Sequence, residues 1–130
     1  MEIKVRFRDT DMLGHVNHAS YLTYMEEARL ELLKKIGIEV KSTGYTIVLV
    51  GLKVDYMKQG YFGQILDVST TISKVGRTSF TLINHIVEKE SNELITKAEV
   101  TIVYYDIDNE KSVEIPDALK DKLKEHLVSE

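Results

Sequence analysis

Apolar and polar side chains alternate along five segments of the chain, with the period of two that is typical of strands with one covered face. The first segment covers residues 3–9, where Ile3, Val5 and Phe7 alternate with charged residues. The other four contain Val48–Val54, Leu66–Ser73, Thr78–Val87 and Leu94–Tyr104. Short polar turns separate the last three segments, so we expect these to form an antiparallel meander.

A spacing of three to four residues replaces this alternation between residues 20 and 36. Apolar side chains recur there at Tyr21, Met25, Ala28, Leu32 and Ile36. The spacing predicts one long amphipathic helix over Ser20–Ile36. Asn17 or Ser20 can cap its first turn, and Gly37 suits the left-handed position that ends a helix.

The order of the elements predicts an α+β fold. A short surface helix is expected after Pro116, because Leu119, Leu123 and Leu127 follow at helical spacing. The sequence of 130 residues fits one domain over residues 1–130. In that domain the long helix must cover one face of a curved antiparallel sheet.

One helix is too short to cover such a sheet. Strands of roughly 10–12 residues extend about 35 Å, whereas the helix over Ser20–Ile36 extends only about 25 Å. The uncovered face or edge is therefore expected to meet another subunit, which predicts a homo-oligomer. The alternative is a monomer with a twisted sheet and one polar face.

Composition removes several classes of protein. Cysteine is absent, which excludes disulfides, thiolate nucleophiles and zinc–thiolate sites. The net charge of -4 argues against a nucleic-acid binder that depends on a basic face. The amino terminus has neither a signal peptide nor a presequence pattern, and the longest apolar run, Ile47–Val50, is far below the ~20 residues that span a bilayer. We therefore expect a cytoplasmic protein with no membrane segment.

One polar segment, Arg8–His18, holds the candidate chemistry. The nucleophile-elbow, P-loop, dinucleotide and zinc-protease motifs are absent from the sequence. A carboxylate such as Asp11 can attack a carbonyl carbon or deprotonate water, and the unpaired N–H groups at a helix start can stabilise the resulting oxyanion. The segment therefore fits an acyl-transfer site.

Two other interpretations of the same segment are open. In the first, Asp9, Thr10 and Asp11 only form a turn and Asn17 only caps the helix. In the second, a metal ion binds a set of two carboxylates and two imidazoles. That set would be Asp9, Asp11, His15 and His18.

The segment resembles a known family in residues 7–21, FRDTDMLGHVNHASY, and in residues 24–29, YMEEAR. Residues 76–80, GRTSF, resemble a later turn of the same family. The family is that of the hotdog-fold acyl-CoA thioesterases related to 4-hydroxybenzoyl-CoA thioesterase. The resemblance implies a long antiparallel sheet wrapped around the main helix. It also implies a homodimer or homotetramer with active sites at the subunit interface, and no metal or organic cofactor.

The same resemblance implies roles for individual residues. Asp11 matches the catalytic carboxylate, and His18 occupies the position whose backbone N–H polarises the thioester carbonyl. Many relatives have asparagine where this chain has His18, so only a role of its backbone carries over. His15 and Asn17 are expected to organise the loop.

Tyr21 and Tyr24 are candidates to line the acyl channel, although aromatic residues at helical spacing are also typical of a core. Other hotdog lineages place the catalytic carboxylate on the helix, where this chain has Glu26 and Glu27. The alternative is that both glutamates only lie on the solvated face of the helix.

The substrate predicted in this way is acyl-CoA or an acyl carrier protein thioester. The turn near Gly76 brings Lys74, Arg77 and Ser79 together, which gives local positive charge and a hydroxyl for a CoA pyrophosphate. An ordinary solvated turn is the alternative. Two other functions are open for the whole chain: a non-catalytic acyl-thioester-binding or assembly module, and a hotdog dehydratase.

Overall fold

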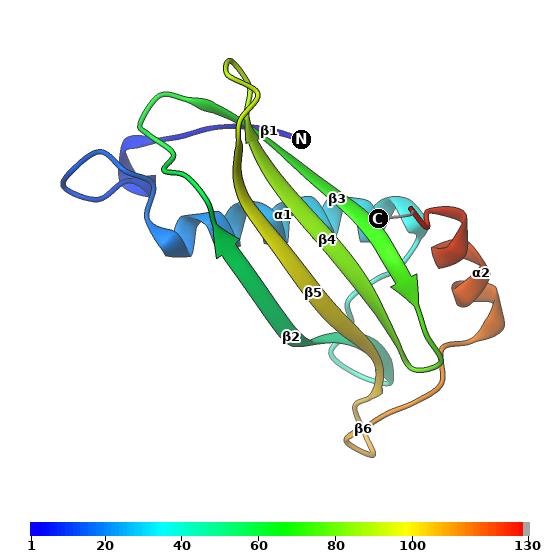
Figure 1. Ribbon diagram of the computed structural model, residues 1–130. Helices are drawn as coiled ribbons and strands as arrows, with labels where there is room; N and C mark the ends of the chain where they lie inside the picture. Colours follow the sequence, from blue (N-terminus) through cyan, green and yellow to red (C-terminus); the bar gives the residue numbers. More distant parts are fainter. Residues whose placement is uncertain (129–130) are drawn as a thin grey trace. The chain divides into compact units, whose positions relative to one another are not determined.

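The computed structural model describes residues 1–128. The elements follow one another as a short strand and a 3₁₀ turn, the long helix, four long strands, a two-residue strand and a short helix (Figure 1). Their bounds are β1 Glu2–Lys4, η1 Phe7–Asp9, α1 His18–Ile36, β2 Tyr45–Tyr56, β3 Ile65–Val75, β4 Ser79–Glu88, β5 Leu94–Asp106, β6 Lys111–Ser112 and α2 Asp117–Glu125.

The strands form one sheet in the order β1-β3-β4-β5-β2, with β6 paired to β5. Strands β3, β4 and β5 are consecutive in the chain and adjacent in the sheet, and the connections between them are short (Figure 1). The predicted meander is therefore confirmed. Strand β1 pairs antiparallel with β3, so that Ile3 lies opposite Leu66.

The predicted strand over residues 3–9 is wrong beyond Lys4. The carboxylate of Asp9 accepts the backbone N–H of Arg6 at 3.0 Å, and the N–H of Asp9 donates to the Arg6 carbonyl at 3.0 Å. These bonds close the chain into η1. The alternation ends there, since Val5 is buried while Phe7 is exposed.

The main helix agrees closely with its prediction. Asn17 is the residue that caps α1, because its Oδ1 accepts the N–H of Ala19 at 2.8 Å. Gly37 ends the helix with a φ of 97°. The N–H groups of Gly37 and Ile38 both donate to the carbonyl of Leu33, at 3.1 and 2.8 Å, which is the hydrogen-bonding expected of a left-handed helix end.

The second helix follows Pro116, as predicted. Leu123 lies in α2 and is fully buried. Leu127 lies beyond the end of the helix, where it forms an isolated bridge with Ile72 of β3.

The chain divides into two compact units. We call residues Met1–Glu31, Val54–Thr70 and Asn84–Ala98 the first unit. The second unit comprises Leu32–Lys53, Thr71–Ile83 and the described residues from Glu99. The first unit contains the segment Arg8–His18, and the second contains the turn at Gly76. The expectation of one domain over residues 1–130, of which 129–130 lie outside the described residues, stays a prediction.

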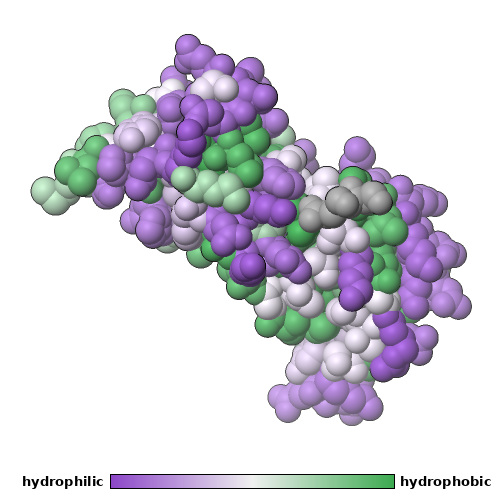
Figure 2. All heavy atoms as spheres, in the orientation of Figure 1, coloured by the Kyte–Doolittle hydropathy of each residue, from purple (hydrophilic) through white to green (hydrophobic). Residues whose placement is uncertain are grey.

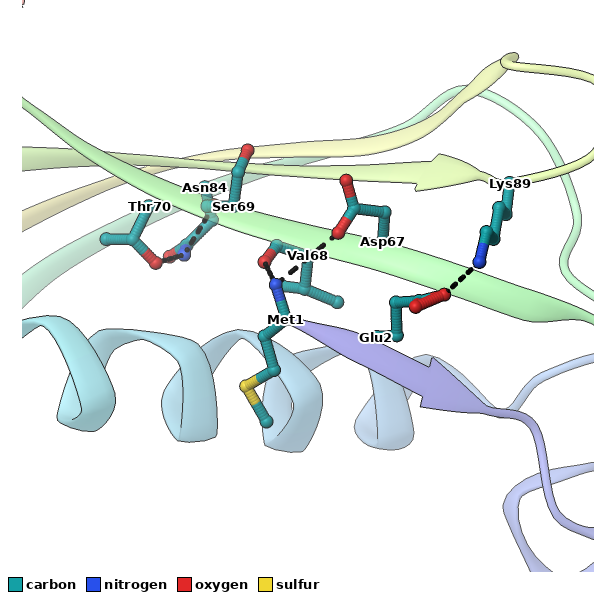
Figure 3. Close-up of polar contacts among 8 residues, drawn as sticks. All are labelled: Met1, Glu2, Asp67, Val68, Ser69, Thr70, Asn84 and Lys89. Atoms are coloured by element: carbon teal, nitrogen blue, oxygen red, sulfur yellow. Dashed lines mark hydrogen bonds and ion pairs between the residues drawn. The ribbon is translucent and has the colours of Figure 1, made fainter.

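In the first unit, a buried polar chain attaches α1 to the sheet. Arg29 of α1 donates to the Oδ1 of Asn84 on β4 at 3.1 Å. The amide of Asn84 in turn donates to the Ser69 carbonyl at 3.2 Å and to the Thr70 hydroxyl at 2.7 Å (Figure 3). Figure 3 also shows the contacts that hold the start of the chain on β3 and the β4–β5 turn. They are the Met1 ammonium with Asp67 and Val68, and the ion pair of Glu2 with Lys89.

Strand β2 stands at one end of the strand order and is largely exposed. Apolar residues remain visible among the polar ones on the molecular surface (Figure 2). On β2 the exposed large apolar side chains are Tyr45, Val48, Leu49, Val50, Leu52 and Tyr56. Among residues 1–128, no helix is both long and apolar enough to cross a membrane.

Candidate active site

The polar segment folds back on itself between η1 and α1. Its two sides pair antiparallel: the N–H of Asp11 donates to the His15 carbonyl and the N–H of Asn17 donates to the Asp9 carbonyl, both at 2.8 Å. Gly14, with a φ of 81°, makes the reversal between them. The segment is therefore a tight loop with a fixed backbone.

The Asp11 carboxylate is exposed, but its orientation is held. Its Oδ1 accepts the N–H of Leu13 at 2.9 Å and that of His15 at 3.2 Å. No group among residues 1–128 donates to its Oδ2. The loop thus fixes one carboxylate oxygen and leaves the other open to a reactant.

The start of α1 supplies a free donor. The N–H of Ala19 is satisfied by Asn17, whereas the N–H of His18, the first residue of the helix, has no partner among the described residues. The imidazole of His18 stacks on the ring of Tyr56, with centroids 4.5 Å apart, and the Tyr56 hydroxyl donates to the His18 carbonyl at 3.4 Å. A helix N-terminus with an unpaired N–H can bind a developing oxyanion.

A second turn of the first unit supports the loop. The N–H of Val16 donates to the Gly60 carbonyl at 2.8 Å, and His15 forms an isolated bridge with Tyr61. The rings of His15 and Tyr61 meet edge to face at 5.0 Å. His15 therefore contributes to the site by holding these two turns together.

The Tyr21 side chain is buried and completes this support. Its hydroxyl accepts the N–H of Gly60 at 2.7 Å. A Cβ at Gly60 would lie 3.1 Å from both the Tyr21 hydroxyl and the Val16 side chain, so glycine allows this close approach. Burial raises the pKa of Tyr21 above its ordinary value.

The Tyr24 side chain is also buried, and its hydroxyl lies beside the Asp9 carboxylate. Burial, and then this carboxylate, raise the pKa of Tyr24 well above its ordinary value. Among residues 1–128, the geometry of no acceptor gives the buried Tyr24 hydroxyl a hydrogen bond.

Lys74, Arg77 and Ser79 lie in the second unit. Lys74 is an exposed residue near the end of β3, and Ser79 begins β4. The Ser79 carbonyl accepts the N–H of Gly76 at 2.8 Å, which closes the turn. Arg77 is exposed and lies 3.9 Å from Glu114.

A model of the thioesterase-like superfamily matches residues 5–123. The chain belongs to this superfamily. The acyl-CoA thioester hydrolase YbgC of Escherichia coli O6:H1 is 31% identical to it, covering 80% of this chain and 79% of its own. The long-chain acyl-CoA thioesterase FadM of Escherichia coli (strain K12) is 26% identical, covering 95% of this chain and 96% of its own.

The solved structure of a predicted thioesterase from Bacillus stearothermophilus superposes on this superfamily member with a TM-score of 0.88. It is 29% identical and covers 100% of this chain and 96% of its own. The predicted hotdog fold is confirmed, and so is the prediction of a thioester hydrolase at the level of the superfamily. The finer assignment to the 4-hydroxybenzoyl-CoA family stays a prediction.

Within this superfamily member, the structure brings six predicted residues together in the first unit. They are Asp11, His15, Asn17, His18, Tyr21 and Tyr24. Their individual catalytic or substrate roles stay predictions, as do those of Lys74, Arg77 and Ser79.

The helix carboxylates and the metal interpretation gain no support. Glu26 and Glu27 are both exposed on α1. Asp9, one of the four predicted metal ligands, has both carboxylate oxygens bonded to Arg6. In residues 1–128, no three histidine, aspartate or glutamate side chains come close enough together to hold a metal ion.

Sequence reasoning missed how four residues contact the site, although it named Asp9 as a turn residue and as a candidate metal ligand. Tyr56 and Gly60 come from a distant stretch of chain and meet α1 only in the folded state, so no local pattern could reveal them. Arg6 and Asp9 form an ion pair of opposite charges three residues apart. That spacing was a usable signal for a tight turn.

Proposed function

We propose that this chain hydrolyses acyl-CoA thioesters to free acid and CoA, with Asp11 as the catalytic carboxylate. The names of YbgC and FadM support the substrate class. The observation that carries the proposal is the state of the Asp11 carboxylate. One of its oxygens is held by two backbone N–H groups, and the other faces no donor among residues 1–128.

The His18 N–H is proposed as the oxyanion donor. In a thioester hydrolysis the carbonyl oxygen becomes negative as the carbonyl carbon turns tetrahedral. An N–H at the start of α1 that has no partner among residues 1–128 can donate to that oxygen without breaking a bond. Asn17 supports this role by accepting the N–H of Ala19 and so capping the helix, and His15 by fixing the far side of the loop.

Two routes use the same atoms. In the first, Asp11 removes a proton from water while the water oxygen attacks the carbonyl carbon, and the carbon–sulfur bond then breaks to release the CoA thiolate, which takes up the proton. In the second, Asp11 attacks the carbonyl carbon itself, CoA leaves, and water hydrolyses the resulting anhydride. Single-turnover hydrolysis in oxygen-18 water separates them, because only the second route places solvent oxygen in the enzyme carboxylate.

The turn at Gly76 is proposed to contact the CoA nucleotide. Lys74 makes no ion pair among the described residues, and Arg77 is held only loosely by Glu114. Both can therefore turn toward a pyrophosphate, and the Ser79 hydroxyl can donate to it.

Release of thiol from a panel of acyl-CoAs tests the proposed function. The panel contains short, long and aromatic acyl groups. A broad panel is needed because an apolar pocket discriminates between substrates by only about 1–3 kcal/mol per methylene. We expect turnover of at least one class. Tight binding without release across the panel would establish the acyl-binding module instead, and hydration of an enoyl thioester would establish the dehydratase.

A second copy of the chain is proposed to cover β2. An edge strand presents unpaired N–H and C=O groups, and β2 adds exposed apolar side chains to that edge. Pairing with the same strand of a second copy would give the backbone groups hydrogen-bond partners and would also bury the apolar side chains. Size-exclusion chromatography with light scattering is expected to give a dimer or tetramer, and Val50→Glu to shift it toward the monomer. A monomer for the unaltered chain would contradict this proposal.

A further inference from the structure

Asp9 is a buried acid that the proposed chemistry does not use. The residue is 6% exposed. The Oδ2 atom accepts the backbone N–H of Arg6 at 3.0 Å and its Nε–H at 3.1 Å, while Oδ1 accepts from Nη2 at 3.2 Å. The two-pronged pairing fixes the plane of the carboxylate as well as its position.

The same residue connects to both parts of the proposed catalytic machinery. Asp9 lies two residues before Asp11, and its carbonyl accepts the N–H of Asn17 at 2.8 Å. Asn17 is the cap of α1 and immediately precedes His18. A shift of Asp9 would therefore move the carboxylate and the oxyanion donor relative to each other.

The surroundings of Asp9 favour a charged, fixed side chain. Burial by itself raises the pKa of Asp9, but the hydrogen bonds and charge of Arg6, together with the Tyr24 hydroxyl, outweigh it and hold this pKa below its ordinary value. On the other side stands the buried hydroxyl of Tyr24, which comes from the second turn of α1. Asp9, at the end of η1, thus contacts Arg6 just before η1 on one side and Tyr24 of α1 on the other.

We propose that Asp9 is a positioning residue, which aligns Asp11 with the N–H of His18 through its bonds to Arg6 and Asn17. This inference rests on the proposed thioester hydrolysis. It differs from a purely structural role, in which Asp9 would stabilise the turn without affecting the chemistry.

The first test compares Asp9→Asn with Asp106→Asn. Asp106 is the control: it is also 6% exposed, and its carboxylate also accepts hydrogen bonds from a residue three positions away, namely from the N–H and the side-chain amide of Asn109. We expect Asp9→Asn to lower kcat by about 10- to 100-fold with KM changed much less, because misalignment of reacting groups acts on the transition state. Asp106→Asn should change neither. A purely structural role predicts similar thermal destabilisation in both variants with full kcat in the folded fraction, and that result would overturn the proposal.

The second test uses surface residues, so it survives if Asp9→Asn fails to fold. Arg6 is half-exposed, and Arg6→Gln removes the guanidinium that orients Asp9. Arg8→Gln is the control, since Arg8 makes no ion pair among residues 1–128. We expect kcat to fall several-fold for Arg6→Gln only. Equal kcat values in the two variants would contradict the positioning role.

A third measurement does not depend on turnover. Backbone amide resonances of Asp11, Asn17 and His18 should shift in Asp9→Asn and in Arg6→Gln, and stay unchanged in Asp106→Asn and Arg8→Gln. Failure of the proposed function would appear as an unaltered chain that releases no thiol while these shifts persist. Failure of this inference would appear as active enzyme whose three amide resonances do not respond.

Discussion

The loop at Asp11 and the turn at Gly76 are both candidate sites, yet they are built differently. The loop is held by side chains from several elements: Asn17 caps α1, Tyr21 accepts from Gly60, and Asp9 pairs with Arg6. Among residues 1–128, the turn at Gly76 is held by backbone bonds alone: the N–H of Gly76 donates to the Ser79 carbonyl, and the carbonyls of Arg77 and Thr78 accept from Ile115 and Tyr104. Its arginine side chain has only a loose pairing with Glu114.

The difference matches the two tasks proposed for them. Stabilising a transition state requires donors and a carboxylate fixed before the substrate arrives, since orientation costs free energy at the moment of reaction. Attracting a pyrophosphate requires only nearby positive charge, which long flexible side chains supply. Changes in the loop should therefore act on kcat, and changes in the turn on KM.

The largest expected effect comes from Asp11→Asn. An amide is neither a comparable base nor a comparable nucleophile, so we expect kcat to fall by about 100- to 10,000-fold with the fold intact. Asp121→Asn, on the exposed surface of α2, is the control and should keep full activity. Turnover unchanged in Asp11→Asn would remove the loop from the chemistry.

Tyr21→Phe tests the rigid support of the loop. It leaves the N–H of Gly60 buried without an acceptor, which should lower the free energy of unfolding by about 1–3 kcal/mol. The Tyr45 hydroxyl makes no hydrogen bond among residues 1–128, so Tyr45→Phe should lower the free energy of unfolding much less. Urea unfolding measures both, and equal values for the two variants would show that the bond to Gly60 contributes nothing.

A smaller effect is expected at the turn. Neutralising Lys74 and Arg77 together, as Lys74→Gln with Arg77→Gln, should raise KM for acyl-CoA by about 3- to 10-fold and weaken its salt dependence. Cleavage of a truncated pantetheine thioester should be nearly unchanged. Lys34→Gln with Lys35→Gln removes the same charge from the exposed end of α1 and serves as control. Equal losses on both substrates would show that the turn supports the fold or the chemistry.

The smallest effect is a pH dependence that originates at Asp9, which faces Arg6 and Tyr24. Its pKa is lowered on folding, so its charged form stabilises the folded state at pH values above the unfolded pKa of about 4. This contribution is lost as pH falls through the folded pKa. The stability difference between the unaltered chain and Asp9→Asn should therefore be constant near neutrality and shrink below about pH 4. A constant difference down to the acid transition would contradict the assignment.

Periodicity predicted the elements whose burial is regular. The helix over Ser20–Ile36 and the β3–β5 meander place apolar residues on one face, so their spacing carries the signal. The strand over residues 3–9 failed because a side chain, Asp9, bonds the backbone of Arg6 and ends the strand. Alternation of apolar residues contains no information about such a bond.

The candidate site likewise contains residues that the sequence could predict and residues that it could not. Asp11 and Asn17 could be predicted because they lie in one contiguous motif before a helix. Tyr56 and Gly60 could not, because their contacts with His18 and Tyr21 join residues 38 and 39 positions apart in the chain. The free state of the His18 N–H follows from where the helix begins, which sequence patterns place only to within a few residues.

A crystal structure of the Asp11→Asn variant with an intact acyl-CoA bound would show directly whether position 11 and the His18 N–H face the thioester. The substitution should slow hydrolysis enough to trap the thioester. We expect the thioester carbonyl oxygen to lie within hydrogen-bonding distance of the His18 N–H, with the side chain at position 11 facing the carbonyl carbon directly or through one water. A thioester bound away from both groups would contradict this expectation.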